Sequence, residues 1–351
     1  MDKKDEIILQ QIDVIRAMTE RNLRRVGADI WGVPKTEAPS APKGDVSAVE
    51  GADEIGKTAV SNGQGDPKAP KEETLEPENI DDLKSELDEY IGLESVKDEV
   101  RDLINMVTVW KLRREHDLPA PDLSLHMVFS GNPGTGKTMI ARFMARVYHS
   151  LGILSKGQLI EVDRSGLVAG YVGQTAIKTS KVLERAKGGV LFIDEAYTLT
   201  SKEGNDFGYE AVDTILKAME DNREDLVVIV AGYIDRMEGF IDSNPGLQSR
   251  FNKYLHFADY SAEEMTDIFL MQCEKNCYTP DGDAVDAIRE YLRMASEEAG
   301  EFGNARGVRN AFEKVLSAQA NRLAAMPDIT REELMRITKE DVQTAVYGKT
   351  E

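Results

Sequence analysis

One segment of the sequence has the residue types and spacing of a phosphate site, GNPGTGKT at residues 131–138. It fits the pattern G-x-x-x-x-G-K-[ST], whose glycines let the backbone wrap a phosphate while successive N–H groups point inward at a helix N-terminus. In this pattern the Lys137 ammonium reaches the outer phosphates of a nucleotide, and the Thr138 hydroxyl ligates Mg²⁺. We therefore predict nucleotide contacts from Gly131, Asn132, Pro133, Gly134, Thr135, Gly136, Lys137, Thr138 and Met139.

Two adjacent carboxylates follow a later apolar run, in LFIDEAY at residues 191–197. Asp194 is expected to lie near the Mg²⁺ and to hold it directly or through water. Glu195 is then placed to polarise an attacking water. Phosphoryl transfer depends mostly on positioning and charge stabilisation, so a metal, a lysine and a water-orienting carboxylate are the parts it needs.

These residues lie between alternating strand and helix patterns. Apolar runs of strand length occupy residues 125–130, 159–163, 190–194, 226–231 and 254–257, and helical patterns occupy 137–152, 174–187 and 207–221. Continuous apolar strands that alternate with helices indicate a parallel sheet covered on both faces. We therefore predict an α/β fold with a five-stranded parallel sheet.

Four segments are expected along the chain. Residues 1–31 contain an amphipathic helix at 5–26, and residues 32–77 are Pro-rich and poor in aromatic residues, which is typical of a flexible tether. Residues 78–258 form the α/β domain, which begins with two helices separated at Gly92. Residues 259–351 show only helical patterns and predict a small all-α domain.

Composition excludes several classes of protein. The chain has 351 residues and a net charge of −20, which argues against a protein whose main partner is nucleic acid. Cys273 and Cys277 lack a second cysteine pair for zinc, so we expect packing residues in a reducing compartment. With no apolar run of membrane-spanning length and no signal peptide, we expect a cytoplasmic protein.

Several motifs together resemble those of AAA+ ATPases: YIGLESVKDEV, GNPGTGKT, LFIDEAY, NPGLQSRF and GNARGVRN. Within that family the chain is most similar to the CbxX/CfqX group, which includes red-type Rubisco activases and the sporulation protein K-like ATPases. The resemblance covers about residues 78–347 and implies a P-loop sheet followed by a helical lid, with ATP and Mg²⁺ as cofactors. It also implies that Tyr90, Ile91 and Gly92 frame the adenine.

The resemblance assigns further roles to single residues. Arg250 matches the arginine finger that reaches the γ-phosphate of a neighbouring subunit. Arg306 matches sensor 2 of the lid, with Arg309 as the alternative on the same helical face. In AAA+ proteins the fourth strand often ends in an Asn called sensor 1, but in this sequence the strand is followed by Tyr233. The Tyr233 hydroxyl could take that role, or its ring could only pack.

The segment GLVAGYVGQT at residues 166–175 resembles an aromatic pore loop, with Tyr171, Val172 and Gly173 as its tip. An aromatic ring there could grip varied peptides. The leading hypothesis is therefore an ATP-driven, hexameric ring that pulls on a protein client, as either a Rubisco-activase-like or a sporulation- or secretion-associated remodeller. The N-terminal helix would dock on its own protein or recruit a partner or adaptor. One alternative is a nucleic-acid motor or loader, which would need basic residues at the pore, and the tip of this loop has none. The other is a slow ATP-dependent switch.

Overall fold

The computed structural model describes residues 77–119, 124–171, 173–201, 207–297 and 302–348. The predicted N-terminal helix, the tether up to residue 76 and the pore-loop residue Val172 lie outside these described residues. Within the described ranges, none of the helices has the length and apolar character that crossing a membrane would require.

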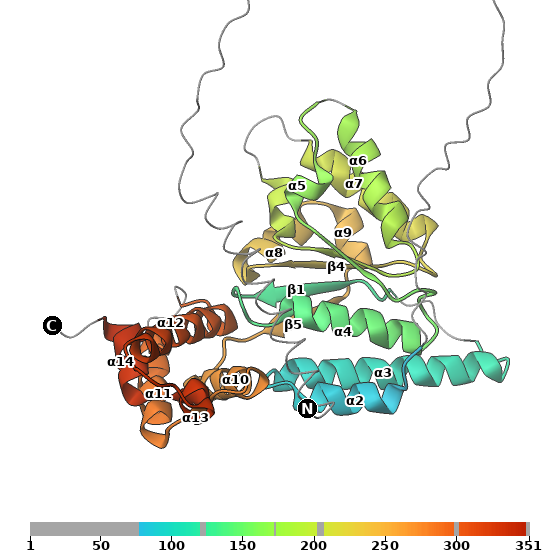
Figure 1. Ribbon diagram of the computed structural model, residues 1–351. Coiled ribbons are helices and arrows are strands. Elements are labelled where there is room, and N and C mark those ends of the chain that lie inside the picture. Colours follow the sequence, from blue (N-terminus) through green and yellow to red (C-terminus); the bar gives the residue numbers. More distant parts are fainter. Residues whose placement is uncertain (1–76, 120–123, 172, 202–206, 298–301, 349–351) are drawn as a thin grey trace, which may run out of the picture. The chain divides into compact units, whose positions relative to one another are not determined.

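A five-stranded parallel sheet forms the centre of the α/β part, as predicted (Figure 1). Its strands lie in the order β2 (Leu159–Val162), β3 (Val190–Ile193), β4 (Val227–Gly232), β1 (Met127–Gly131) and β5 (Lys253–Phe257). The residues of β3 and β4 are buried along the whole length of both strands. This burial explains why these segments are apolar without the alternation of a half-exposed strand.

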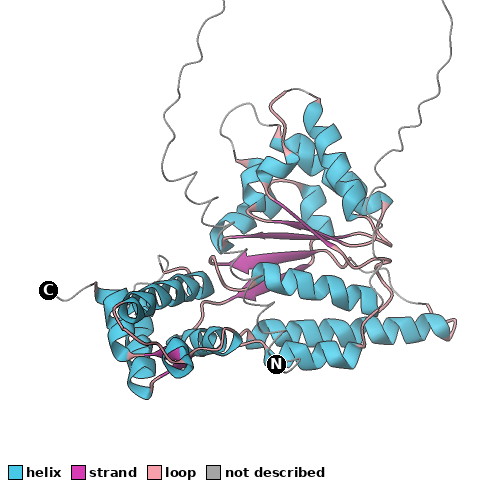
Figure 2. Cartoon of the chain, viewed as in Figure 1, coloured by secondary structure: helices cyan, strands magenta, loops and turns pink. Residues whose placement is uncertain are grey.

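Helices cover both faces of the sheet, which is the second part of the predicted fold (Figure 2). The elements around the sheet are α2 (Ile80–Glu89), α3 (Glu94–Glu115), α4 (Lys137–Ser150), α5 (Arg164–Leu167), α6 (Gln174–Ala186), the 3₁₀ helix η1 (Ala196–Thr200), α7 (Gly208–Asp221), α8 (Ile234–Asp242) and α9 (Pro245–Arg250). Because successive side chains of a strand point to opposite faces, Phe192 and Ile229 pack with α2, α3 and α4, whereas Leu191 and Val230 pack with α6, α7 and α8.

A second group of helices follows Tyr260. It comprises α10 (Ala262–Lys275), α11 (Gly282–Glu297), α12 (Asn304–Ala324), α13 (Arg331–Met335) and α14 (Lys339–Tyr347). Three of these helices begin with a capping box, in which a Ser or Thr side chain and an acidic side chain three residues later bond each other's main-chain N–H. The pairs are Ser261 with Glu264, Thr330 with Glu333, and Thr338 with Asp341.

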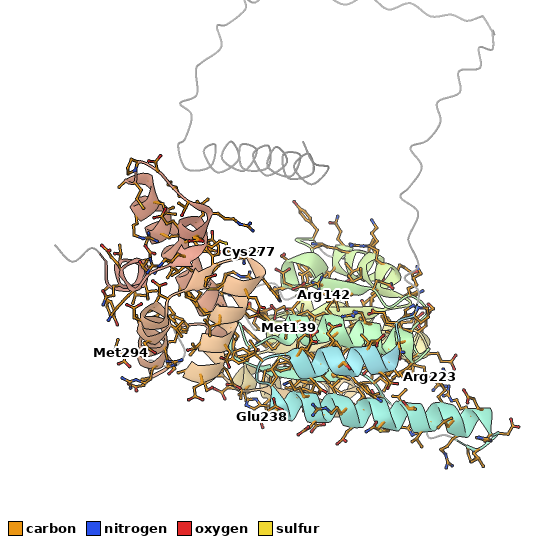
Figure 3. All side chains as sticks on the ribbon, turned by 60° about the horizontal axis from the view of Figure 1, so that its bottom comes forward. Met139, Arg142, Arg223, Glu238, Cys277 and Met294 are labelled. Atoms are coloured by element: carbon orange, nitrogen blue, oxygen red, sulfur yellow. The ribbon has the colours of Figure 1, made fainter. Side chains whose placement is uncertain are left out.

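Two details of this helical part differ from the sequence predictions. Residues Thr279–Pro280 (β6) and Arg336–Ile337 (β7) form a short parallel pair, so the part is not purely helical. Strands of two residues are too short to show an alternating pattern. Cys273 is buried as expected, but Cys277 follows the end of α10 in a left-handed conformation and is exposed, so it is not a packing residue (Figure 3).

Candidate active site

The segment 131–138 forms the turn between β1 and α4, and its glycines are required there. A Cβ on Gly131 would lie 2.4 Å from the main-chain oxygen of Phe257, and one on Gly134 would lie 2.2 Å from that of Gly303. Gly136 precedes α4 with a φ of 94°, in the left-handed region. Close packing at positions 131 and 134 and the backbone conformation at position 136 therefore restrict these three positions of the loop to glycine.

The side chain of Lys137 lies along this loop. Its Nζ donates hydrogen bonds to the main-chain oxygens of Gly131 at 2.9 Å and Asn132 at 2.7 Å. Burial lowers the pKa of Lys137, while the carboxylate of Asp194 acts in the opposite direction. An ammonium group held in this way faces the space in which anionic phosphates can bind.

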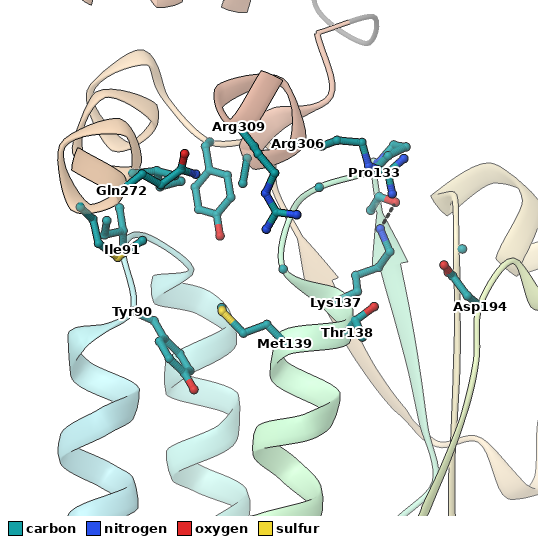
Figure 4. A pocket seen from close by; sticks show the side chains of 18 of the residues that line it. Tyr90, Ile91, Pro133, Lys137, Thr138, Met139, Asp194, Gln272, Arg306 and Arg309 are labelled. Carbon is teal, nitrogen blue, oxygen red and sulfur yellow. Dashed lines mark hydrogen bonds between the residues drawn. The ribbon is translucent and has the colours of Figure 1, made fainter. Parts of the chain in front are cut away.

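A cavity of about 530 Å³ opens beside the loop, between the α/β part and the helices after Tyr260 (Figure 4). Figure 4 shows Tyr90, Ile91 and Met139 on one side of it, and Lys137 and Asp194 on the other. An apolar wall that continues into a charged end suits a ligand with a base at one end and phosphates at the other. The other predicted residues that line the cavity are Gly131, Pro133, Gly134, Gly136, Thr138, Glu195, Tyr233 and Arg306.

Three predicted contact residues have other surroundings. Asn132 and Thr135 do not line the cavity, and the buried Thr135 donates from Oγ1 to the main-chain oxygen of Asn132 at 2.8 Å. Gly92 also lies outside the lining. A Cβ on Gly92 would come within 2.3 Å of Oε1 of Glu264, so this glycine allows the α2–α3 turn to approach α10.

Asp194 and Glu195 follow the last residue of β3, where the chain turns sharply. Glu195 has a φ of 48°, an uncommon conformation for a residue with a side chain. Its N–H donates to Oδ1 of Asp194 at 3.0 Å, and the hydroxyl of Thr198 donates to its main-chain oxygen at 2.7 Å. Both carboxylates line the cavity, so the turn brings them to its charged end.

Tyr233 follows the last residue of β4 and also lines the cavity. Its ring lies 6.1 Å from the ring of Tyr197, and the Arg236 guanidinium stacks over both rings, at 5.0 Å from Tyr197 and 5.5 Å from Tyr233. A Cβ on Gly232 would lie 2.7 Å from the Tyr197 ring. The ring of Tyr233 is therefore packed in a cluster beside the two carboxylates, and both roles considered for it remain possible.

Both arginines considered for sensor 2 line the cavity from α12. Figure 4 shows the Arg309 guanidinium pointing into the cavity, whereas the Arg306 side chain extends over Pro133. Arg306 lies close enough to Lys137 to help lower the pKa of that lysine. Four cationic side chains therefore line the cavity, those of Lys137, Lys275, Arg306 and Arg309.

Sequence reasoning did not find several residues of this site. Tyr260 lines the cavity from the linker, and α10 contributes Ile268, Met271, Gln272 and Lys275. Glu89, Gly232 and Ala305 also belong to the lining. Burial raises the pKa of Tyr260 to about 12. The only signal of the α10 residues in the sequence is their helical spacing, which is the same for a core face and for a ligand-facing one.

Comparisons with known proteins agree with this geometry. The profile of the ATPase family associated with various cellular activities (AAA) matches residues 127–258, and that of the AAA lid domain matches residues 261–351. Protein CbxX of the plasmid of Cupriavidus necator is 45% identical over 255 residues, which are 72% of this chain and 80% of that protein. The chain belongs to the CbxX group of AAA+ ATPases.

A second relative supports this membership, and a solved structure shows the fold. The chloroplastic ribulose bisphosphate carboxylase/oxygenase activase of Cyanidioschyzon merolae is 43% identical over 268 residues, 76% of this chain and 90% of that protein. The solved FIGL-1 AAA domain in complex with ADP has the same fold, with a TM-score of 0.51 and 20% identity over 74% of this chain and 82% of that chain. As an AAA ATPase, the protein binds nucleotide and hydrolyses ATP.

In this AAA+ ATPase the predicted arginine finger lies away from the cavity of its own chain. Arg250 ends α9, and its main-chain oxygen accepts a hydrogen bond from the hydroxyl of Ser124, which precedes β1. The phosphate loop follows the other end of β1. The Nη2 of Arg250 contacts Oε2 of Glu220 at 3.1 Å, and its Nε is buried without a partner in the described part of the chain.

The loop after β2 exposes the aromatic ring that the sequence singled out. Tyr171 is 73% exposed, and a Cβ on Gly170 or Gly173 would meet nothing within 4 Å. The start of the loop is held by α6, because Thr175 accepts a bond from the N–H of Ala169 at 3.0 Å. Lys178 donates from Nζ to the main-chain oxygens of Ser165 at 2.5 Å and Val168 at 3.0 Å. Hydrogen bonds therefore hold the start of the loop, whereas Gly170, Tyr171 and Gly173 are exposed to solvent.

Proposed function

We propose that this ATPase assembles into a hexameric ring that hydrolyses ATP between neighbouring subunits and uses Tyr171 to pull on a protein client. Lys137 binds the outer phosphates, and Glu195 polarises the attacking water. Arg250 reaches the nucleotide of the neighbouring subunit, where a cation stabilises the charge of the transition state. Arg306 contacts phosphate from the lid, and hydrolysis changes the angle between lid and sheet domain.

The observation that carries the proposal is the exposure of Tyr171. Because the ring is 73% exposed, the isolated chain loses the stabilisation that burying a large apolar group would contribute. On a loop open at both glycines but anchored at its base, such a ring can contact a polypeptide without reading its sequence. The position of Arg250 outside its own cavity supports a site completed by a second subunit.

The residues at the charged end suit a magnesium ion. Thr138 and Asp194 line the same cavity and offer a hydroxyl and a carboxylate oxygen, the type of ligand that Mg²⁺ takes together with nucleotide phosphates. When bound, the ion would neutralise charge on those phosphates. Tyr90 and Ile91 form the apolar wall suited to the adenine, and Gly92 shapes the turn behind them.

Mixing two inactive variants tests the shared site. Arg250→Ala keeps Glu195, and Glu195→Gln keeps Arg250. In a mixed ring some interfaces combine the intact Glu195 of one subunit with the intact Arg250 of its neighbour. We expect each variant alone to lose at least about 100-fold in kcat, and the mixture to recover hydrolysis. A mixture that stays inactive, or a Glu195→Gln protein that stays monomeric with ATP and Mg²⁺, would contradict the ring.

The client is tested with Tyr171→Ala, which should keep ATP hydrolysis within about two-fold and lose client remodelling. Glu195→Gln should hold ATP and capture the client for identification. A Rubisco is the first client to assay, because one relative is named as a Rubisco activase. Equal remodelling by Tyr171→Ala would reject the pulling role, and hydrolysis stimulated by DNA would favour a nucleic-acid motor instead.

Two expectations from the sequence are tested separately. Deleting residues 1–31 should weaken capture of an adaptor or client while the ATPase activity of the purified protein persists. The cytoplasmic location stays a prediction, which fractionation of the native host cells would check.

A further inference from the structure

Three segments that are far apart in the sequence meet through one carboxylate. Asp259 lies between β5 and α10, Asn132 lies in the phosphate loop, and Asn304 begins α12. The Nδ2 of Asn132 donates to both carboxylate oxygens of Asp259, at 3.0 and 2.9 Å, and the Nδ2 of Asn304 donates to its Oδ1 at 2.8 Å. One carboxylate therefore joins the phosphate loop to the lid.

Asn304 also bonds the main chain on both sides of this junction. Its Oδ1 accepts a hydrogen bond from the N–H of Tyr260 at 2.9 Å, and its Nδ2 lies 3.3 Å from the main-chain oxygen of Pro133. Only 8% of the residue is exposed, and its φ is 53°. A buried amide that uses both its donor and its acceptor is costly to replace, because either partner would lose a hydrogen bond.

The main chains touch at the same place. The N–H of Ala305 donates to the main-chain oxygen of Gly134 at 3.2 Å, and a Cβ on Gly134 would lie 2.2 Å from the oxygen of Gly303. The first turn of α12 is thus seated directly on the phosphate loop. Arg306 belongs to that turn, so its distance from the phosphates depends on how α12 sits.

We propose that Asn304 and Asp259 are positioning residues for ATP hydrolysis, which hold the first turn of α12 on the phosphate loop so that Arg306 faces the nucleotide bound by Lys137. The residue types suit this task. A carboxylate only accepts hydrogen bonds, so both of its neighbours must be donors, and an amide at position 304 serves Asp259 and Tyr260 at once. The inference rests on the proposed role of Arg306, and its test separates the two.

A reciprocal exchange tests the contact itself. Asn304→Asp replaces a hydrogen bond by two carboxylates that repel each other, and we expect kcat to fall about 10-fold or more. Asp259→Asn turns one carboxylate oxygen into an NH2 group, which faces the NH2 group of Asn132 or Asn304 and cannot accept from it, so kcat should fall a few-fold. In the Asp259→Asn/Asn304→Asp double variant the new amide donates to the new carboxylate and accepts from Asn132. Only the longer bond to the main-chain oxygen of Pro133 is not restored, so we expect kcat within about three-fold of the wild type.

Two further measurements exclude a role in stability alone. Because Asn304→Asp also lowers stability, kcat is measured well below the melting temperature of this variant, and should still fall about 10-fold. Added to Arg306→Ala, Asn304→Asp should lower kcat by less than about two-fold, because it acts through Arg306. A double exchange as slow as Asn304→Asp would overturn the inference. If Arg306→Ala hydrolyses ATP normally, the proposed role of Arg306 is wrong. The reciprocal exchange of residues 259 and 304 still shows whether their contact affects kcat.

Discussion

Arg164 donates a hydrogen bond from Nη1 to the main-chain oxygen of Thr198 at 2.5 Å. Arg164 begins α5, which leads into the loop of Tyr171, and Thr198 lies in the turn that follows Glu195. Thr198 is itself bonded to Glu195, because its N–H and its hydroxyl both donate to the main-chain oxygen of that residue. The turn of Glu195 and the exposed aromatic loop are therefore connected within one subunit.

We predict that Arg164→Met uncouples the Tyr171 loop from nucleotide state. Tyr171→Cys in a Cys277→Ser background offers a single labelling site, because burial raises the pKa of Cys273 to about 12 and leaves its thiol unreactive. An environment-sensitive dye at position 171 should change its fluorescence between the ADP and ATP states. In Arg164→Met this change should fall at least about two-fold while nucleotide still binds.

Arg185→Met is the matched control, because it removes an exposed arginine from the last turn of α6. It should leave the fluorescence change as in the parent protein. An Arg164→Met protein with the full change would show that the bond to Thr198 carries no coupling.

A second prediction concerns the cluster beside Glu195. Arg236→Ala removes the cation that stacks on Tyr197 and Tyr233, and we expect kcat to fall about 10-fold with a smaller change in KM. Arg236→Lys keeps a cation over the rings and should lose less. Steady-state ATPase assays over a range of ATP concentrations separate the two parameters, and an Arg236→Ala enzyme with normal kcat would contradict the prediction.

Variants of Tyr233 then decide between its two possible roles. If the ring alone supports the cluster, Tyr233→Ala is impaired much more than Tyr233→Phe. We expect this order, because the ring has two stacking partners in the described part of the chain. Equal loss in both variants would assign the function to the hydroxyl, as a sensor 1 group.

The sequence was sufficient for features that depend on neighbours along the chain. Fewer than ten consecutive residues are enough to identify the phosphate loop, the two carboxylates and each of the buried strands β3 and β4. No such short segment indicates the cluster of Tyr197 and Arg236 or the junction at Asp259. Asn132 and Asp259 are 127 residues apart, and nothing in either local sequence specifies that the fold brings them together.

Local patterns also misjudged Cys277. The spacing of four residues from Cys273 suits one helical face, but α10 ends at Lys275, and the left-handed turn at Cys277 directs the chain toward β6. Helix ends depend on capping and on the packing of the following segment, so they are less predictable than helix interiors.

A third prediction concerns the stability of the lid. The carboxylate of Asp341 is only 1% exposed and accepts bonds from Nε and Nη2 of Arg322, at 2.8 and 2.9 Å. Burial raises the pKa of Asp341, but the hydrogen bonds from Arg322 and Thr338 outweigh it and leave the pKa below its usual value. Arg322→Met should therefore lower the free energy of unfolding by about 3 kcal/mol, because it leaves a buried charge without its partner.

Urea unfolding at neutral pH measures this effect, with Arg293→Met as the control. Arg293 pairs with Glu290 and Glu297 on the exposed surface of α11, so its loss should lower the free energy of unfolding much less than the loss of Arg322 does. Since the native pKa of Asp341 is depressed, its stabilisation is present above about pH 4 and is lost as the pH falls through the native value. Equal destabilisation by the two variants would contradict the prediction.

The last prediction is a pH dependence that comes from the start of β1. The Nδ1 of His126 accepts a hydrogen bond from the N–H of Val228 at 3.0 Å, which requires the neutral ring. Burial, aided by the nearby charge of Arg250, lowers the pKa of His126 to about 4. As the pH is lowered from about 6.5 to 4, the unfolded chain therefore takes up a proton that the native chain does not. The free energy of unfolding falls by up to about 3 kcal/mol over this range.

The variant His126→Gln retains an acceptor for Val228 but cannot titrate. Its free energy of unfolding, measured with urea at pH 7, 6, 5 and 4.5, should therefore fall less steeply toward low pH than that of the wild type. Parallel curves for the two proteins would show that His126 is not the group that titrates in this range.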